Sequence, residues 1–400
     1  MPSVQIYDFP DISVKVTPKQ LAVICKNNKY IWWDPKDAVF ILDVEKKTAE
    51  KISLTDTCVK SASRLVEGAV YGNKAYMKTF YVPSSGTLRI REIEIDLENK
   101  TASLGDYIDV NDSDFDEDNK AQGLRKLIIF ASPHKPYIWF IDPDTGEFDK
   151  FDTGFGEYNP RISLKGLLTK DDLKLIIGRH LAGDKWYILS VYHREVTALQ
   201  SINSDSPIHT LLPAVYFYDD IYFFCSGSNV VNSSPNWYIF DKNFNKLAEI
   251  SFTDIYSNPH YYGFECLGRN GDHIYLFGII TNNHLEYATE EKLVMVDIDR
   301  STWSKSVTTL LTISDMSNGL EISTNDCHAD VRWLGFVDKK NKKLYLPAGR
   351  YDKSQLWDYK CPALVEIDYS DLEIEEYNQN LYFKGEEKIP TTLSLTITPL

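Results

Sequence analysis

The chain has 400 residues, of which 43% are hydrophobic and 13% aromatic, and its formal net charge is −15 at pH 7. Nucleic-acid-binding proteins usually present a basic face, so this acidic balance argues against DNA, RNA or an anionic membrane surface as partners. Aromatic side chains favour strands, and no apolar run approaches the roughly 18 residues of a membrane span.

The first residues, MPSVQIYDFP, lack the basic start and long apolar middle of a secretion signal, so we expect a soluble intracellular protein. The cysteines show no CxxC spacing, and a chain of this length does not need disulfides for stability. We expect free thiols at all six positions, which are Cys25, Cys58, Cys225, Cys266, Cys327 and Cys361.

One phrase recurs along the chain: an apolar run that ends in Asp, a polar turn, and an alternating strand. VFILDVEKKTAEKISL, from Val39, and YIWFIDPDTGEFDKF, from Tyr137, are two copies. The recurring aspartates are Asp43, Asp96, Asp142, Asp241, Asp297 and Asp368, and a seventh copy has Tyr192 in place of Asp. The repeat of roughly 50 residues is a propeller-blade period.

A second hairpin of two apolar strands precedes most copies, as in AVYFYDDIYFF and LGFVDKKNKKLYLPAG. Each unit therefore has four strands, and its sheet is apolar on both faces, which only stacking against other sheets can bury. The sequence predicts an all-β fold with one domain over residues 1–400, a seven-bladed β-propeller with four antiparallel strands per blade. The blades are expected at residues 20–54, 61–104, 107–152, 161–202, 211–252, 262–313 and 329–377.

Two further alternating segments lie outside these units, at residues 3–16 and 391–399. We expect both to form strands that lie in or beside the same blade and close the ring as a terminal clasp, because an open ring would expose the apolar faces of its first and last blades.

The blade resembles a kelch-type blade. A glycine falls near the end of the second strand in four units, at Gly178, Gly227, Gly278 and Gly349, and IDPDTGEF and VDIDRSTW match the later part of the kelch pattern. The double glycine of that family is absent. The resemblance implies a propeller and no particular activity.

Catalytic signatures such as GxSxG, HExxH, GxxxxGK[ST] and CxxC are absent from the sequence. Asp112, Asp114 and Asp116 have the alternate spacing of a calcium loop, but Glu117 and Gly123 stand where that loop needs Gly and Glu. We interpret this stretch as a solvated acidic loop and predict no calcium.

In such units the turns within each hairpin lie at one end of the sheet, and the longer loops between hairpins and between units lie at the other, the long-loop end. Six of the eight histidines fall in these longer loops, at His134, His180, His209, His260, His284 and His328. Long ordered loops on a rigid scaffold usually carry function.

We therefore expect a protein, peptide or glycan ligand at the long-loop end of blades five to seven, without catalysis and without a cofactor. The candidate ligand-binding residues are His260, Tyr261, Tyr262, His284, Tyr287, Asp326, Arg350, Tyr351 and Trp357. The alternative is an enzyme at the same place that uses iron or zinc on His260, His284 and His328, or carboxylates alone. The remaining possibility is that these side chains have only a structural role and pack the loops against one another.

Overall fold

The computed structural model describes only part of the chain. The described residues are 1–10, 29–34, 38–53, 64–71, 73–115, 120–124, 127–131, 135–152, 165–168, 173–178, 186–190, 195–198, 210–217, 220–228, 233–241, 245–283, 287–315, 318–322, 336–351, 359–378 and 382–383. Within these ranges the secondary structure is strand, without an α-helix, and thus without a helix that is long and apolar enough to cross a membrane.

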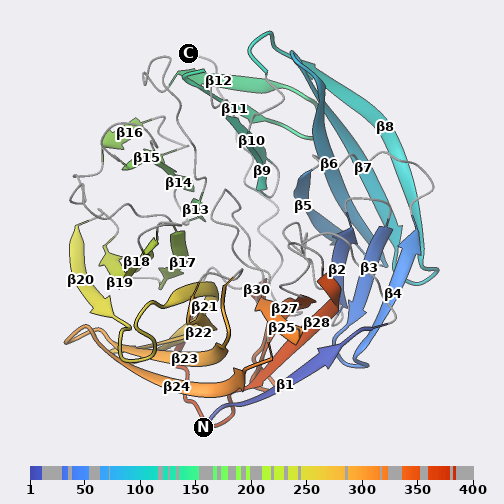
Figure 1. Ribbon diagram of the computed structural model, residues 1–400. Helices are drawn as coiled ribbons and strands as arrows, with labels where there is room; N and C mark the ends of the chain where they lie inside the picture. Colours follow the sequence, from blue (N-terminus) through green and yellow to red (C-terminus); the bar gives the residue numbers. More distant parts are fainter. Residues whose placement is uncertain are drawn as a thin grey trace. The chain divides into compact units, whose positions relative to one another are not determined.

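The chain divides into two compact units. One holds the described residues within 20–199, and they form four sheets (Figure 1). The first sheet consists of β2 (Lys29–Asp34), β3 (Ala38–Asp43) and β4 (Thr48–Ser53), and the second consists of β5 (Arg64–Tyr71), β6 (Lys74–Ser84), β7 (Thr87–Asp96) and β8 (Thr101–Asn111). The third sheet consists of β9 (Lys120–Leu124), β10 (Leu127–Ala131), β11 (Tyr137–Ile141) and β12 (Phe148–Asp152). The fourth sheet consists of β13 (Lys165–Leu168), β14 (Leu173–Gly178), β15 (Trp186–Ser190) and β16 (Glu195–Ala198).

The other unit holds the described residues within 1–19, 200–327 and 332–384, and they form three sheets. The fifth sheet is β17 (Thr210–Tyr216), β18 (Ile221–Ser228), β19 (Ser233–Phe240) and β20 (Lys246–Ser251); the sixth is β21 (His260–Asn270), β22 (His273–Thr281), β23 (Glu291–Asp299), β24 (Ser304–Ile313) and β29 (Glu376–Tyr377); the seventh is β1 (Ser3–Asp8), β25 (Gly319–Ile322), β26 (Phe336–Asp338), β27 (Lys343–Tyr351), β28 (Tyr359–Asp368) and β30 (Tyr382–Phe383).

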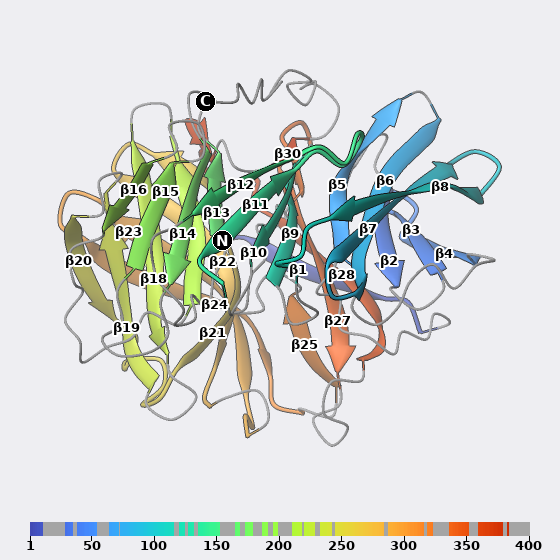
Figure 2. The ribbon, with the colours of Figure 1, turned by 90° about the horizontal axis from the view of Figure 1, so that it is seen from above.

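In the first six sheets, strands that follow one another along the chain pair antiparallel, as Figure 2 shows for β5 to β8. In the seventh sheet β25 and β26 both pair antiparallel with β27, and β26 pairs parallel with β30. Residues 107–111 lie in a different sheet from the one that the sequence predicted. They were assigned to the third blade, yet they extend β8 of the second sheet, and β9 is the first described strand of the third. The sequence after Gly105 alternates, and this period is the same for a continued strand as for a new one.

The N-terminal strand β1 pairs with β28 in the seventh sheet, from Ser3 opposite Asp368 to Asp8 opposite Ala363. β1 forms an edge strand next to β28, whereas the predicted seventh blade continued after β28 through residues 372–377. The last two of those residues, Glu376 and Tyr377, instead form β29 on the β21 edge of the sixth sheet. The second half of the predicted clasp, residues 391–399, lies outside the described residues.

Alternate residues of each strand pack on the two faces of its sheet. One buried cluster joins the fifth and sixth sheets, with Phe224, Trp237, Phe264 and Leu276 among its members, and another joins the sixth and seventh, with Leu267, Ile279, Leu346 and Val365. Cys266 and Cys361 are buried and are not joined by a disulfide within the described part of the chain.

The recurring aspartate caps a turn. The Asp96 carboxylate accepts hydrogen bonds from the backbone N–H groups of Glu98 and Asn99 at 3.0 and 2.9 Å. The same role falls to Asp43, Asp142, Asp241 and Asp368. In the sixth sheet the prediction was wrong by two residues, because Asp299 caps the turn and Asp297 instead contacts His273. The phrase therefore marks a turn and not a reactive site.

Four of these turns place a left-handed residue four positions after the aspartate, and the β26–β27 turn, where Asp338 accepts from the Asn341 N–H, does the same. These residues are Lys47, Lys100, Gly146, Trp303 and Lys342, with φ between 51° and 75°. A side chain raises the energy of this conformation, and glycine adopts it readily.

Replacing Lys342 by glycine is therefore expected to stabilise the protein. Its φ is 51°, and its carbonyl accepts a 2.9 Å hydrogen bond from the Tyr369 N–H that glycine would retain. We expect the free energy of unfolding, measured by urea titration, to rise by about 0.5–1 kcal/mol. Lys340→Gly in the same turn is the matched control; it should destabilise, because Lys340 has no positive φ to relieve. Equal effects of the two substitutions would contradict this account.

Candidate functional site

A buried polar row lies at the long-loop end of the sixth sheet. His260 begins β21, Thr281 ends β22 and Glu291 begins β23, and the strand register places them side by side. All three are buried, and the Glu291 carboxylate accepts a 2.5 Å hydrogen bond from the Leu320 N–H of β25. This row therefore joins the loop ends of the sixth and seventh sheets, where the sequence placed the site.

The β22–β23 loop rises from this row and is tied at its base. Nδ2 of Asn282 donates to Oγ1 of Thr289 at 2.7 Å, and Oδ1 of Asn282 accepts from the Thr289 N–H at 3.0 Å. The Thr281 hydroxyl donates to the Asn283 carbonyl at 2.6 Å. Side chains thus fix both ends of the loop, although residues 284–286 at its centre lie outside the described ranges.

Tyr287 stands on this loop with 66% of its surface exposed, more than any other aromatic side chain among the described residues. The adjacent Ala288 is fully buried. Ala288 therefore anchors the chain directly beside a large aromatic ring that faces solvent.

The neighbouring β20–β21 loop is tied to the same place. The Tyr256 hydroxyl donates to Glu290 at 2.8 Å, and the Lys292 ammonium lies over the Tyr256 ring, 4.5 Å from its centre. Burial and the hydrogen bond to Glu290 raise the pKa of Tyr256, so the phenol stays protonated at neutral pH. Two loops from different stretches of sequence thus form one connected surface, which we call the tyrosine platform: Tyr256, Asn282, Tyr287, Thr289, Glu290 and Lys292.

The other described candidates take structural positions. Tyr261 is buried against Trp237, Phe252 and Phe264, and burial raises its pKa. Its ring lies in the core between the fifth and sixth sheets, so we leave it out of the ligand set. Tyr262 is half-buried on the other face of β21, and Arg350 binds Asp8 at 2.8 Å and the Asn318 carbonyl at 2.9 Å.

The remaining candidates lie outside the described residues: His284, Asp326, His328 and Trp357. Tyr351 is described only as the last residue of β27. Among the side chains that the structure describes, no group of three or more His, Cys, Asp or Glu is arranged to hold a metal ion. The proposed metal set contains only one described member, His260.

Lysine side chains form ion pairs with aspartates of the acidic stretch after β8. The Lys150 ammonium lies 3.2 Å from the Asp112 carboxylate and 2.5 Å from that of Asp114, and Lys135 lies 3.4 Å from Asp114. Oδ2 of Asp112 also accepts from Nε1 of the buried Trp139 at 3.0 Å. Burial raises the pKa of Asp112, but its hydrogen bonds outweigh burial and lower the pKa overall. These carboxylates hold the third sheet to the end of β8.

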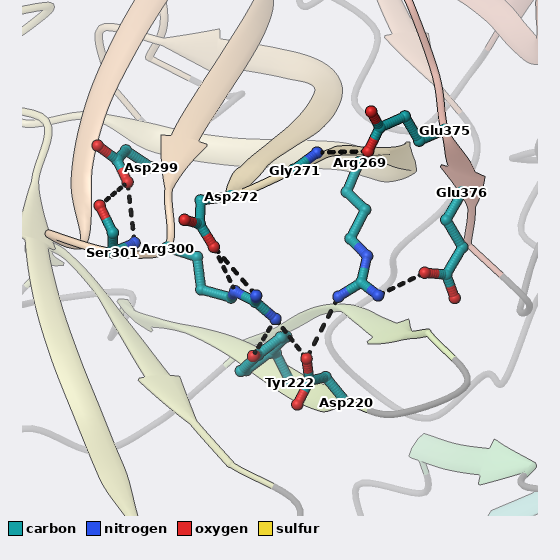
Figure 3. A network of polar contacts seen from close by, with 10 residues as sticks. All are labelled: Asp220, Tyr222, Arg269, Gly271, Asp272, Asp299, Arg300, Ser301, Glu375 and Glu376. Atoms are coloured by element: carbon teal, nitrogen blue, oxygen red, sulfur yellow. Dashed lines mark hydrogen bonds and ion pairs between the residues drawn. The ribbon is translucent and has the colours of Figure 1, made fainter.

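Sequence reasoning missed a polar network at the opposite, short-turn end of the sixth sheet (Figure 3). Arg269 of β21 and Arg300 of the β23–β24 turn both bind the Asp220 carboxylate, and Arg300 also binds Asp272 at 3.0 Å. Glu376 of β29 lies 2.5 Å from the Arg269 guanidinium. In the sequence, this network is indicated only by acidic and basic residues in short turns, and their pattern does not show which of them form ion pairs.

The sequence matches no protein-family model and no curated protein. Among solved structures, the chain is similar to YCF48 from Cyanidioschyzon merolae, with 7% identity, a TM-score of 0.52, and coverage of 90% of this chain and 98% of that one. Dihydro-heme d1 dehydrogenase NirN in complex with DHE has 11% identity and a TM-score of 0.45, and the match covers 89% of this chain and 65% of NirN. The WD40 domain of SCAP from fission yeast has 12% identity and a TM-score of 0.43, over 88% of this chain and 85% of that one.

At such identities a structural likeness shows the fold alone, and of these three matches only that to YCF48 exceeds a TM-score of 0.5. The chain therefore has a β-propeller-type fold, as the sequence predicted. The kelch-like character of its blades remains a prediction.

Proposed function

We propose that the chain is a non-catalytic binding module that recognises a protein, peptide or glycan segment at the tyrosine platform. The observation that carries this proposal is Tyr287, a solvent-facing aromatic ring on a loop that is hydrogen-bonded at its base. An exposed aromatic ring buries a large area on binding, and tyrosine is enriched among residues that dominate binding energy.

The ties within the platform lower the entropic cost of binding. Asn282 holds the β22–β23 loop, and the Tyr256 hydroxyl holds the adjoining loop to Glu290. Ordering a loop opposes association, so a surface that is already ordered binds more tightly. The hydroxyl, amide and charged groups around the ring offer partners for a polar segment, such as a peptide backbone or a sugar.

We also propose that the seven sheets are the seven blades of one closed propeller over residues 1–400. In this arrangement β1 would complete the last blade as its outer strand, and residues 391–399 would lie beside it as the second half of the clasp. The pairing of β1 with β28 supports this proposal.

The alternative is an enzyme at the same end of the sheets, using iron or zinc on His260, His284 and His328. His260 is buried in the row with Thr281 and Glu291, so a buried histidine at the loop end is its only support among the described residues. This alternative requires stoichiometric metal in the purified protein, which elemental analysis would detect.

Removing the Tyr287 ring should abolish binding and preserve the fold. The probe is a set of peptides selected from a random library for binding to the wild-type protein. Such peptides can be obtained without knowing the natural ligand. We expect Tyr287→Ala to weaken binding of these peptides by a factor of 10 to 100 in calorimetric titrations, the loss of roughly 1.4–2.8 kcal/mol that a central aromatic anchor contributes.

Tyr107→Ala is the matched control, since Tyr107 is the next most exposed tyrosine among the described residues, at 41%, and lies on β8 of the other unit. It should leave the affinity unchanged. Peptides that bind wild type and Tyr287→Ala equally well, while both are folded, would disprove the platform as the binding site.

A further inference from the structure

The segment after the seventh sheet binds the sixth sheet as an added strand. From Tyr369 the chain crosses to β21, where Glu376 pairs with Arg269 and Tyr377 with Gly268. The Glu375 N–H donates to the Arg269 carbonyl at 2.9 Å, and the Asn378 N–H donates to the Leu267 carbonyl at 3.1 Å. We call residues 371–378 the strap.

The strap is bound as a peptide ligand is bound. Leu372, Ile374 and Tyr377 pack against the core cluster of the sixth and seventh sheets. Asn378 is buried, and its Nδ2 donates to the Cys266 carbonyl at 3.2 Å. The intervening side chains of Asp371, Glu373 and Glu375 are exposed. Recognition by strand addition has this form: main-chain hydrogen bonds give affinity, and alternate side chains give specificity.

The β21 edge is shaped for this ligand. A Cβ atom on Gly268 would lie 2.5 Å from the Glu376 carbonyl oxygen, so only glycine leaves room for the strap backbone. Arg269 recognises the charge of the strap: its guanidinium binds Glu376 at 2.5 Å and Asp220 at 3.2 Å (Figure 3). The guanidinium also lies over the Phe217 ring, 4.6 Å from its centre. The Gly271 N–H donates to the Glu375 carboxylate at 2.9 Å.

From this geometry we infer that the β21 edge is a second binding site, which accepts an extended acidic segment of a partner protein with the pattern apolar-Glu-Glu-aromatic-Asn. The strap is the intrachain occupant of this site and blocks it. Only two residues form the ladder, so the side-chain contacts largely decide which segment is bound. A tethered segment has a high effective concentration, so a partner competes only where the strap is weakened or the partner is abundant. The site is separate from the tyrosine platform and does not depend on it.

Competition within the 400-residue chain tests this inference. The probe is a fluorescent synthetic peptide of residues 371–380, DLEIEEYNQN. The double variant Ile374→Ala/Glu376→Gln weakens the strap and leaves β21 unaltered. We expect it to bind the peptide at least tenfold more tightly than wild type in fluorescence anisotropy, and hydrogen exchange of residues 372–378 should rise in parallel.

Adding Gly268→Ala to the double variant should abolish peptide binding, because the methyl group occupies the place of the strap backbone. If the double variant does not fold, Glu376→Gln alone provides the same comparison. Three results would overturn the inference: no peptide binding by a variant with a strap that exchanges freely, binding that survives Gly268→Ala, and concentration-dependent self-association that excludes the peptide. The last would assign the edge to a second copy of this chain.

Discussion

Deletion of residues 2–9 is expected to destabilise the protein strongly. Six residues of β1 pair with β28, and Val4 and Ile6 pack on the core cluster that joins the sixth and seventh sheets. Phe9 is buried and its N–H donates to the Pro362 carbonyl at 3.0 Å, while Asp8 binds Arg350. Losing two half-buried aliphatic side chains and one buried aromatic ring should cost about 4 kcal/mol or more, seen as a lower urea midpoint.

A double substitution in the same strand controls for the backbone. Ser3 and Gln5 are exposed on β1, so Ser3→Ala/Gln5→Ala should change the free energy of unfolding by less than about 0.5 kcal/mol. A synthetic peptide of residues 1–10 should restore part of the lost stability when it is added to the deleted protein. An unchanged urea midpoint after the deletion would show that β1 does not hold the seventh sheet.

Truncating Trp237 is expected to have a comparable effect. Its side chain is fully buried, and its ring centre lies 4.5 Å from that of Phe252 and 4.8 Å from that of Phe264. Trp237→Ala should cost about 3–5 kcal/mol, because it removes the centre of the aromatic cluster and leaves a cavity.

Trp237→Phe should cost much less, about 1–2 kcal/mol. The indole Nε1 is buried and has no hydrogen-bond partner within the described part of the chain, so phenylalanine keeps an aromatic ring and removes an unsatisfied donor. Leu247→Ala, at an exposed position of the same sheet, is the control and should be nearly neutral. Equal losses for the alanine and phenylalanine variants would contradict this explanation of the cluster.

The repeated phrase predicted the sheets because its chemistry is local. An aspartate that caps its own turn needs only the next few residues, so Asp43, Asp96 and Asp142 could be recognised from the sequence. The sixth sheet shows the limit of this signal. Its DID sequence offers two aspartates two residues apart, and which one ends the strand depends on the strand partner and not on the local pattern.

Long-range pairing could not be predicted in the same way. The strap alternates apolar and polar residues, and this period is the same whether it joins its own sheet or the next one. Its true position depends on Gly268 and Arg269, more than 100 residues away. The same limit applies to Tyr261 and Tyr262: both are aromatic, both sheet faces are apolar, and only the neighbouring sheets decide which ring lies in which core cluster.

Hydrogen exchange on the 400-residue chain, with and without a library-selected peptide, tests the central claim most directly. The proposed function predicts protection confined to residues 252–262 and 282–292, which hold the tyrosine platform and the strand ends beneath it. Protection of the short turns at 299–304 or 338–343, or binding without protection at the platform, would contradict it.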